Sequence, residues 1–143
     1  MSIGSKNRDN IFRAIKNTTE LALLFSILIG VILYVLNFYI IALFTDITIL
    51  RNLTNELWGL VVITPFVSML AFQLDGIFIG ATLAKEMRNC IIFSSIIFYL
   101  TLEFFIGNNL TLKNLYSCFL LFLILRGVFL ILYLPRIFKL IKD

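Results

Sequence analysis

The chain contains no histidine and only two cysteines among its 143 residues. Zinc sites and nucleophilic catalysis by a Cys–His pair depend on these residue types, so neither chemistry is expected. Cys90 and Cys118 stand far apart without metal-binding or redox spacing, and we interpret both as small apolar side chains of helices. Phosphate-binding glycine loops, paired catalytic carboxylates and Ser/His/Asp arrangements are also missing. The sequence therefore predicts neither an enzyme nor an organic cofactor.

Charge is scarce as well, because only 14% of the residues are charged and 61% are hydrophobic. A soluble domain is nearer one quarter charged, and the mean hydropathy here is +1.04. This composition predicts a membrane protein whose main partner is the lipid bilayer. The net charge of +4 does not indicate a nucleic-acid partner, since the basic residues lie mostly between and beyond the apolar runs.

Four apolar runs are each close to or longer than the stretch of about 20 residues that crosses a hydrocarbon core of about 30 Å. They cover residues 21–44, 57–82, 89–107 and 115–135. Residues 1–20 form a basic lead-in, either an interfacial helix or a disordered segment, and residues 136–143 form a basic tail. The predicted fold is all-α: an integral membrane protein with one bundle of four transmembrane helices.

The distribution of basic residues predicts the orientation of the bundle. One side of the predicted bundle carries nine of them: Lys6, Arg8, Arg13, Lys16, Lys85, Arg88, Arg136, Lys139 and Lys142. The opposite side carries only Arg51 and Lys113. Because basic loops stay in the cytoplasm, both termini are expected there, in a multi-pass protein of the inner cell membrane.

The second apolar run carries a stripe of polar residues around one acid. On an ideal helix of about 100° per residue, Thr64, Ser68, Asp75 and Thr82 fall, with Ala71, within an arc of about 60°. A charged side chain at the bilayer centre costs roughly 3–17 kcal/mol, so a carboxylate there needs a partner or a function. The stripe therefore identifies one face of this helix as a candidate site.

Asp75 has two interpretations. It either pairs with an arginine to fix the bundle, or binds a proton or a metal cation inside a wet cavity; we favour the second, because intramembrane acids are usually functional. Pro65 removes one backbone hydrogen bond from the same helix and is expected to kink it.

Arg126 stands near the middle of the fourth run, where it needs an anion or water. Asp75 and Glu103 are the acids at membrane level, and we expect an ion pair with one of them rather than a substrate contact. Glu103 stands four residues before Gly107, so it can instead reach the outer interface. The lengths of the runs leave the choice of acid open.

Several segments resemble one transporter family. Residues 74–82 read LDGIFIGAT and residues 86–89 read EMRN, which is similar to the tenth helix and following loop of MATE transporters, most closely their DinF branch. Pro65 stands where that helix carries a proline, and Leu43–Thr45 resembles the LFT ending of the ninth helix. Gly4 and the basic residues after it resemble the loop before the ninth helix. The resemblance assigns the chain to helices nine to twelve, the end of the C-terminal lobe of a twelve-helix protein.

The resemblance implies cation-coupled antiport of drugs and other organic solutes by alternating access between two lobes. Asp75 matches the tenth-helix acid that contributes to a cation site in sodium-coupled members. Thr64, Ser68 and Thr82 would support it. The proton-coupled DinF group uses an acid on the first helix instead, and this chain has no counterpart of that helix. The coupling ion is thus sodium or a proton, and sodium at Asp75 is the one metal implied.

The family is much longer than this chain, so the resemblance also implies a C-terminal fragment that does not transport alone. It would be a remnant or would act with a separately encoded N-terminal portion. One alternative is a self-sufficient four-helix drug exporter acting as a dimer, which the lack of an ionisable residue in 21–44 disfavours. Another is a non-transporting membrane interaction protein in which Asp75 and Arg126 are structural.

Overall fold

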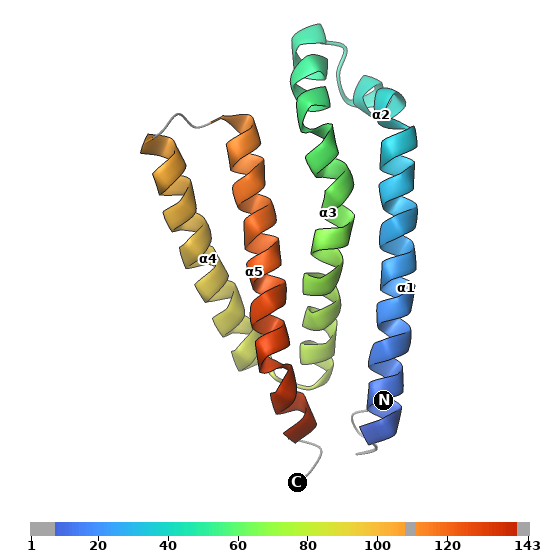
Figure 1. Cartoon of the computed structure of the whole chain (residues 1–143), viewed down its shortest axis with the longest axis vertical. Coiled ribbons are helices and arrows are strands. Elements are labelled where there is room, and N and C mark those ends of the chain that lie inside the picture. Colours follow the sequence, from blue (N-terminus) through green and yellow to red (C-terminus); the bar gives the residue numbers. More distant parts are fainter. Residues whose placement is uncertain (1–7, 108–110, 140–143) are drawn as a thin grey trace.

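The computed structural model describes residues 8–107 and 111–139, and these form α-helices without any strand. The helices are α1 (Arg8–Val35), α2 (Asn37–Phe44), α3 (Thr48–Gly80), α4 (Ala84–Gly107) and α5 (Leu112–Lys139) (Figure 1). All except α2 are long and apolar enough to cross a membrane. The predicted all-α fold with four membrane-spanning helices is confirmed, and the chain is a membrane-embedded protein.

The helices extend beyond the apolar runs that predicted them. The described part of the lead-in, from Arg8 onward, is helical and continuous with the first span. The run 21–44 is divided at Leu36, after which the short helix α2 turns toward the start of α3 (Figure 1). A helix can continue through polar residues as well as through apolar ones. Hydropathy therefore predicted the positions of the membrane spans better than the residues at which the helices begin and end. The residues before Arg8 and after Lys139 lie outside the described residues.

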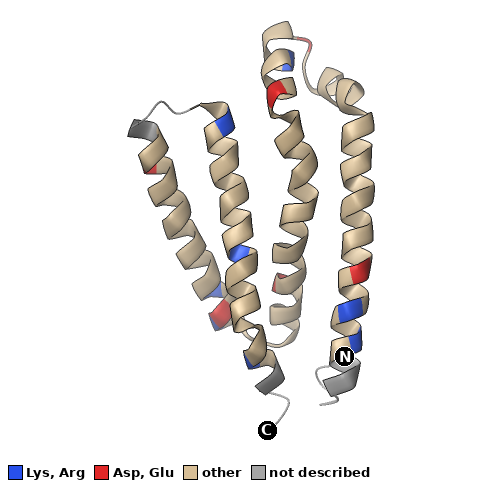
Figure 2. Ribbon diagram, viewed as in Figure 1, with Lys and Arg blue, Asp and Glu red and all other residues tan. Residues whose placement is uncertain are grey.

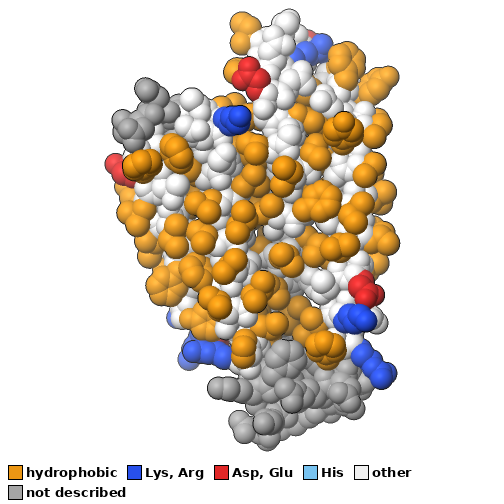
Figure 3. Space-filling view, viewed as in Figure 1, with side chains coloured by type: hydrophobic (Ala, Val, Ile, Leu, Met, Phe, Trp, Pro, Cys, Tyr) orange, Lys and Arg blue, Asp and Glu red, His pale blue; other side chains and the backbone are white. Residues whose placement is uncertain are grey.

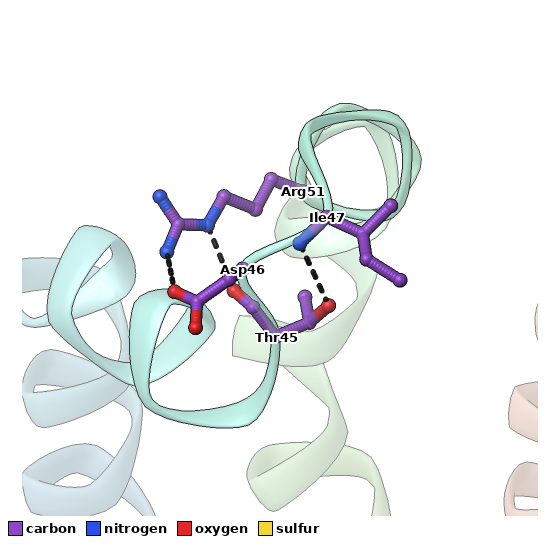
Figure 4. A network of polar contacts seen from close by, with 4 residues as sticks. All are labelled: Thr45, Asp46, Ile47 and Arg51. Carbon is purple, nitrogen blue, oxygen red and sulfur yellow. Dashed lines mark hydrogen bonds and ion pairs between the residues drawn. The ribbon is translucent and has the colours of Figure 1, made fainter.

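A polar network fixes the connection between α2 and α3. The Arg51 guanidinium donates from Nε to the Thr45 carbonyl at 2.8 Å and from Nη2 to Asp46 Oδ1 at 3.0 Å (Figure 4). The Ile47 amide donates to Thr45 Oγ1 at 3.2 Å. Because Arg51 stands on the first turn of α3, these bonds hold the connection against the beginning of that helix.

Helices α1 and α3 are antiparallel, and two polar contacts define their alignment. Trp58 Nε1 donates to the Leu33 carbonyl at 2.9 Å, and Gln73 Nε2 donates to Thr19 Oγ1 at 2.5 Å. Position 58 of α3 therefore lies beside position 33 of α1, and position 73 beside position 19. Gln73 thus faces α1, on a different side of α3 from the polar stripe.

Helix α5 lies between α3 and α4 (Figure 1). It runs parallel to α3, where Gly127 approaches the backbone of Ala71, and antiparallel to α4, where Phe93 packs near Phe129. A buried apolar cluster joins the three helices near the α3–α4 turn; it contains Leu74, Phe78, Ala81, Cys90, Leu130 and Ile137. Hydrophobic side chains cover the middle of the visible face, and charged ones lie toward its ends (Figure 3). Such a surface suits lipid or further helices.

The end of α3 corrects one prediction, because Thr82 does not share a helical face with Asp75. The helix ends at Gly80, and Thr82 has a positive φ of 59°. The Leu83 amide bonds the Phe78 carbonyl at 3.0 Å, and the Thr82 amide bonds the Ile79 carbonyl at 3.0 Å. This hydrogen-bond pattern is a Schellman motif, which closes a helix through one left-handed residue. Thr82 therefore belongs to the turn before α4.

Gly30 permits the close approach of α1 to α3. A Cβ atom added at Gly30 would lie 2.7 Å from Phe66 Cε2, whereas one added at Gly76 would meet no atom within 4 Å. We expect Gly30→Val to lower the free energy of unfolding by about 1–3 kcal/mol more than Gly76→Val does, the usual cost of overpacking. Thermal unfolding of both variants in detergent measures this, and equal losses would contradict the α1–α3 packing.

Candidate functional site

The structure brings Asp75 of α3 to Arg126 of α5. Arg126 Nη2 donates to Asp75 Oδ2 at 2.5 Å. The hydroxyls of Thr64 and Tyr116, 2.7 Å apart, form a second contact between the same helices. The two contacts join residues 51 and 52 positions apart, as expected for parallel neighbouring helices. The carboxylate that faces Arg126 is therefore that of Asp75.

Glu103 lies elsewhere. It is exposed and stands four residues before the end of α4, whereas Asp75 stands five residues before the end of α3. Since α4 begins directly after the turn that ends α3, Glu103 is about 28 Å along α4 from that turn. Its position fits the alternative in which this side chain reaches the opposite interface.

The Asp75–Arg126 pair is largely withdrawn from the surface of the bundle. The Asp75 side chain is 10% exposed and that of Arg126 is 17% exposed. At this degree of burial, either charge alone would carry a desolvation cost of several kcal/mol, which the opposite charge partly offsets. Each charge therefore offsets part of the desolvation cost of the other. Removal of one side chain leaves the remaining charge buried without an opposite charge beside it.

Hydrogen bonding within the pair is incomplete. Asp75 Oδ1 and Arg126 Nε are both buried and have no hydrogen-bond partner among the described residues. A carboxylate oxygen is a strong acceptor and a guanidinium Nε–H is a strong donor, so each unmade bond costs about 1–3 kcal/mol. The pair thus keeps one acceptor and one donor available inside the bundle.

The pair lies toward the basic end of the bundle. Gln73, two residues before Asp75, contacts Thr19 of α1, and the nearby side chains of Lys16 and Glu20 are 65% and 66% exposed. From Asp75 to the end of α3 is about 7.5 Å at 1.5 Å per residue. Charged residues of the bundle gather toward its two ends (Figure 2). Asp75 is therefore nearer to this end of α3 than to the middle of the helix.

The remaining residues of the predicted stripe lie further along α3. Thr64 donates to the Leu60 carbonyl at 2.9 Å besides contacting Tyr116, and Ser68 Oγ donates to the Pro65 carbonyl at 3.3 Å. Helix α3 continues as one element through Pro65. The sequence interpretation did not single out Tyr116, whose offset of 52 from Thr64 is one residue longer than the offset of 51 from Asp75 to Arg126.

A groove of about 640 Å³ runs between α1 and α3. Its lining is mainly apolar and aromatic, with a few hydroxyl and amide groups that include Thr64, Ser68 and Gln73. The groove approaches the charged pair through Phe72, whose ring centre is 6.0 Å from the Arg126 guanidinium carbon. An apolar groove with a few polar groups is the usual form of a site for small organic molecules.

The residues around Asp75 do not fit a sodium ion. A hard cation such as sodium takes several oxygen ligands. The Asp75 carboxylate instead contacts the Arg126 guanidinium, whose positive charge would repel the ion. Throughout residues 8–107 and 111–139, no group of three or more His, Cys, Asp or Glu side chains could hold a metal ion. A proton needs no such set of ligands.

These features define a four-span helical membrane protein with a charged pair between its second and fourth spans. Over 127 residues, the sequence is 36% identical to DNA damage-inducible protein F of Escherichia coli (strain K12). The matched region covers 87% of this chain and 26% of that protein, so the chain spans about a quarter of the length of its relative. No family model matches the chain, and no solved structure matches it.

Proposed function

We propose that the chain is a MATE-type transporter subunit of the DinF branch, corresponding to helices nine to twelve of the C-terminal lobe. The 36% identity over 87% of the chain carries this proposal. The LDGIFIGAT segment and the EMRN segment after it support the same branch. The proposed activity is cation-coupled antiport of drugs or other organic solutes.

The proposed activity requires helices beyond these four. In alternating access, two bundles move about a site at their interface, and this chain spans 26% of the length of its relative. The large exposed apolar side chains of the bundle, such as Phe72 at 60% exposure, are suited to contact such helices as well as lipid. A separately encoded N-terminal portion is one source of them.

The proposed coupling ion is a proton at Asp75. Adding a proton to the carboxylate removes its negative charge and with it most of the attraction to Arg126. The contact between α3 and α5 then weakens, while loss of the proton restores it. Protonation can therefore bias the relative position of these two helices, which is what coupling requires.

A dye-accumulation assay in an efflux-deficient bacterial strain tests the proposed function. The chain is expressed alone or with a form of the E. coli relative that lacks the segment this chain matches. We expect lower accumulation of a fluorescent organic cation only when both are present. The truncated relative with its own missing segment is the positive control. Efflux by the chain alone would favour the four-helix dimeric exporter, and efflux in neither case would favour a non-transporting protein.

The proposed orientation has both termini in the cytoplasm of the cell. Lys113 and Lys85 are both exposed and stand at opposite ends of the spans, whereas Cys90 and Cys118 are buried. In intact cells we expect a membrane-impermeant maleimide to label Lys113→Cys and not Lys85→Cys. Labelling of Lys85→Cys alone would reverse the orientation. Permeabilised cells, in which both variants react, provide the control.

A further inference from the structure

We propose that the Asp75–Arg126 pair binds one water molecule, which bridges Asp75 Oδ1 and Arg126 Nε. These two atoms are buried and unpartnered among the described residues, although the pair is otherwise in contact. The oxygen requires a donor and the Nε–H requires an acceptor. Water supplies both functions at once, which neither a metal ion nor a simple anion does.

The geometry of the two groups favours one bridging molecule over two separate ligands. In a guanidinium, Nε–H and one N–H of Nη2 point from the same edge, which is why arginine and a carboxylate often form a two-bonded fork. Here only the bond from Nη2 to Oδ2 is made. Oδ1 and Nε, the atoms that would make the second bond of such a fork, are the two that lack partners among the described residues, and a water molecule between them would close it.

The surroundings of the pair allow a water molecule to reach it. Arg126 is 17% exposed and lies over the Phe72 ring, which also lines the groove between α1 and α3. Buried waters typically make two to four hydrogen bonds to protein groups that otherwise lack partners. The pair supplies two of them.

The water gives the carboxylate a route for protonation, a role that rests on the proposed proton coupling. A proton arriving at the water forms a hydronium ion, which passes a proton to Asp75 Oδ1. The products are a neutral carboxylic acid and the original neutral water, while Arg126 keeps its charge. Because Oδ1 accepts the proton, the bond from Arg126 to Oδ2 is still intact when the transfer occurs.

Water-edited solid-state NMR of the full chain in lipid bilayers tests the water site. With ¹⁵N-labelled arginine and tryptophan, the rate at which magnetisation passes from water to each side-chain N–H is measured. Trp58 Nε1–H is the dry control, because it is buried and bonded to the Leu33 carbonyl. The Arg126 signal is assigned by its loss in Arg126→Lys or, should that variant not fold, by correlation to its own backbone.

We expect the Arg126 Nε–H signal to build up several-fold faster than that of Trp58. Asp75→Glu, whose longer side chain can close the fork directly, is expected to slow it. Build-up in the wild-type chain as slow as that of Trp58 would overturn the proposal and indicate a direct two-bonded pair. The measurement needs no transport, so failure of the proposed antiport activity leaves the water signal unchanged, and the two failures are distinguishable.

Discussion

Arg126→Leu is expected to lower the stability of the bundle by about 3–5 kcal/mol, the cost of leaving a buried charge without its partner. Asp75 is 7% exposed, and the described residues contain no second cation bonded to it. The substituted leucine restores apolar contact but supplies no donor, so Oδ2 loses the hydrogen bond that it accepts from Arg126. The expected stability loss therefore arises mainly from the Asp75 carboxylate, which stays buried without an opposite charge, and less from the loss of the packing contacts of Arg126.

A double-mutant cycle separates these contributions. Thermal unfolding in detergent is measured for Arg126→Leu, Asp75→Asn and the combined variant. We expect the combined variant to recover most of the loss, because it leaves neither charge unpaired. Additive losses would show that the two side chains act independently and would contradict the buried pair.

A second arginine–aspartate pair in the same chain supplies the control. Arg51 bonds Asp46 at 3.0 Å, but the Asp46 side chain is fully exposed (Figure 4). An exposed pair contributes about 0–1 kcal/mol, so Asp46→Asn is expected to change stability within that range. If Asp46→Asn lowered stability as much as Arg126→Leu, the large stability loss expected for Arg126→Leu could not be attributed to burial of its ion pair.

Asp75→Asn is expected to raise dye accumulation in the complemented strain to the level seen with an empty vector. Asparagine has nearly the same size as aspartate but neither carries the charge nor takes up and releases a proton. Arg126 then meets an amide whose charge cannot change with the proton gradient. Coupling is lost even where the bundle folds.

The matched control for this substitution is Glu103→Gln, which removes an acid of the same chain that is exposed near the end of α4. We expect its dye accumulation to equal that of the wild-type chain. Accumulation is normalised to the amount of each variant in the membrane. If Asp75→Asn reduced only that amount and left efflux per molecule unchanged, Asp75 would be structural and the proposed coupling role would be wrong.

The sequence by itself determined the class of this protein and its unusual residues. The length and hydropathy of a run depend only on neighbouring residues, so four spans could be predicted before any packing was known. Asp75 and Arg126 were evident for the same reason, since a charged residue within an apolar run is a local feature. The resemblance to one transporter branch also depended on short contiguous segments, LDGIFIGAT above all.

The tertiary structure decided what depends on the alignment of distant helices. Arg126 meets Asp75 and not Glu103 because α3 and α5 run parallel with matched offsets, which the lengths of the runs leave open. Thr82 leaves the polar face because a Schellman motif ends α3 before it. The contact of Gln73 with Thr19 sets which part of α1 lies beside the end of α3 that carries Asp75. The Arg126–Asp75 and Gln73–Thr19 contacts join side chains far apart in sequence, so they have no local signal. The Schellman motif is local, but it depends on a left-handed conformation at Thr82 that is uncommon for a residue other than glycine.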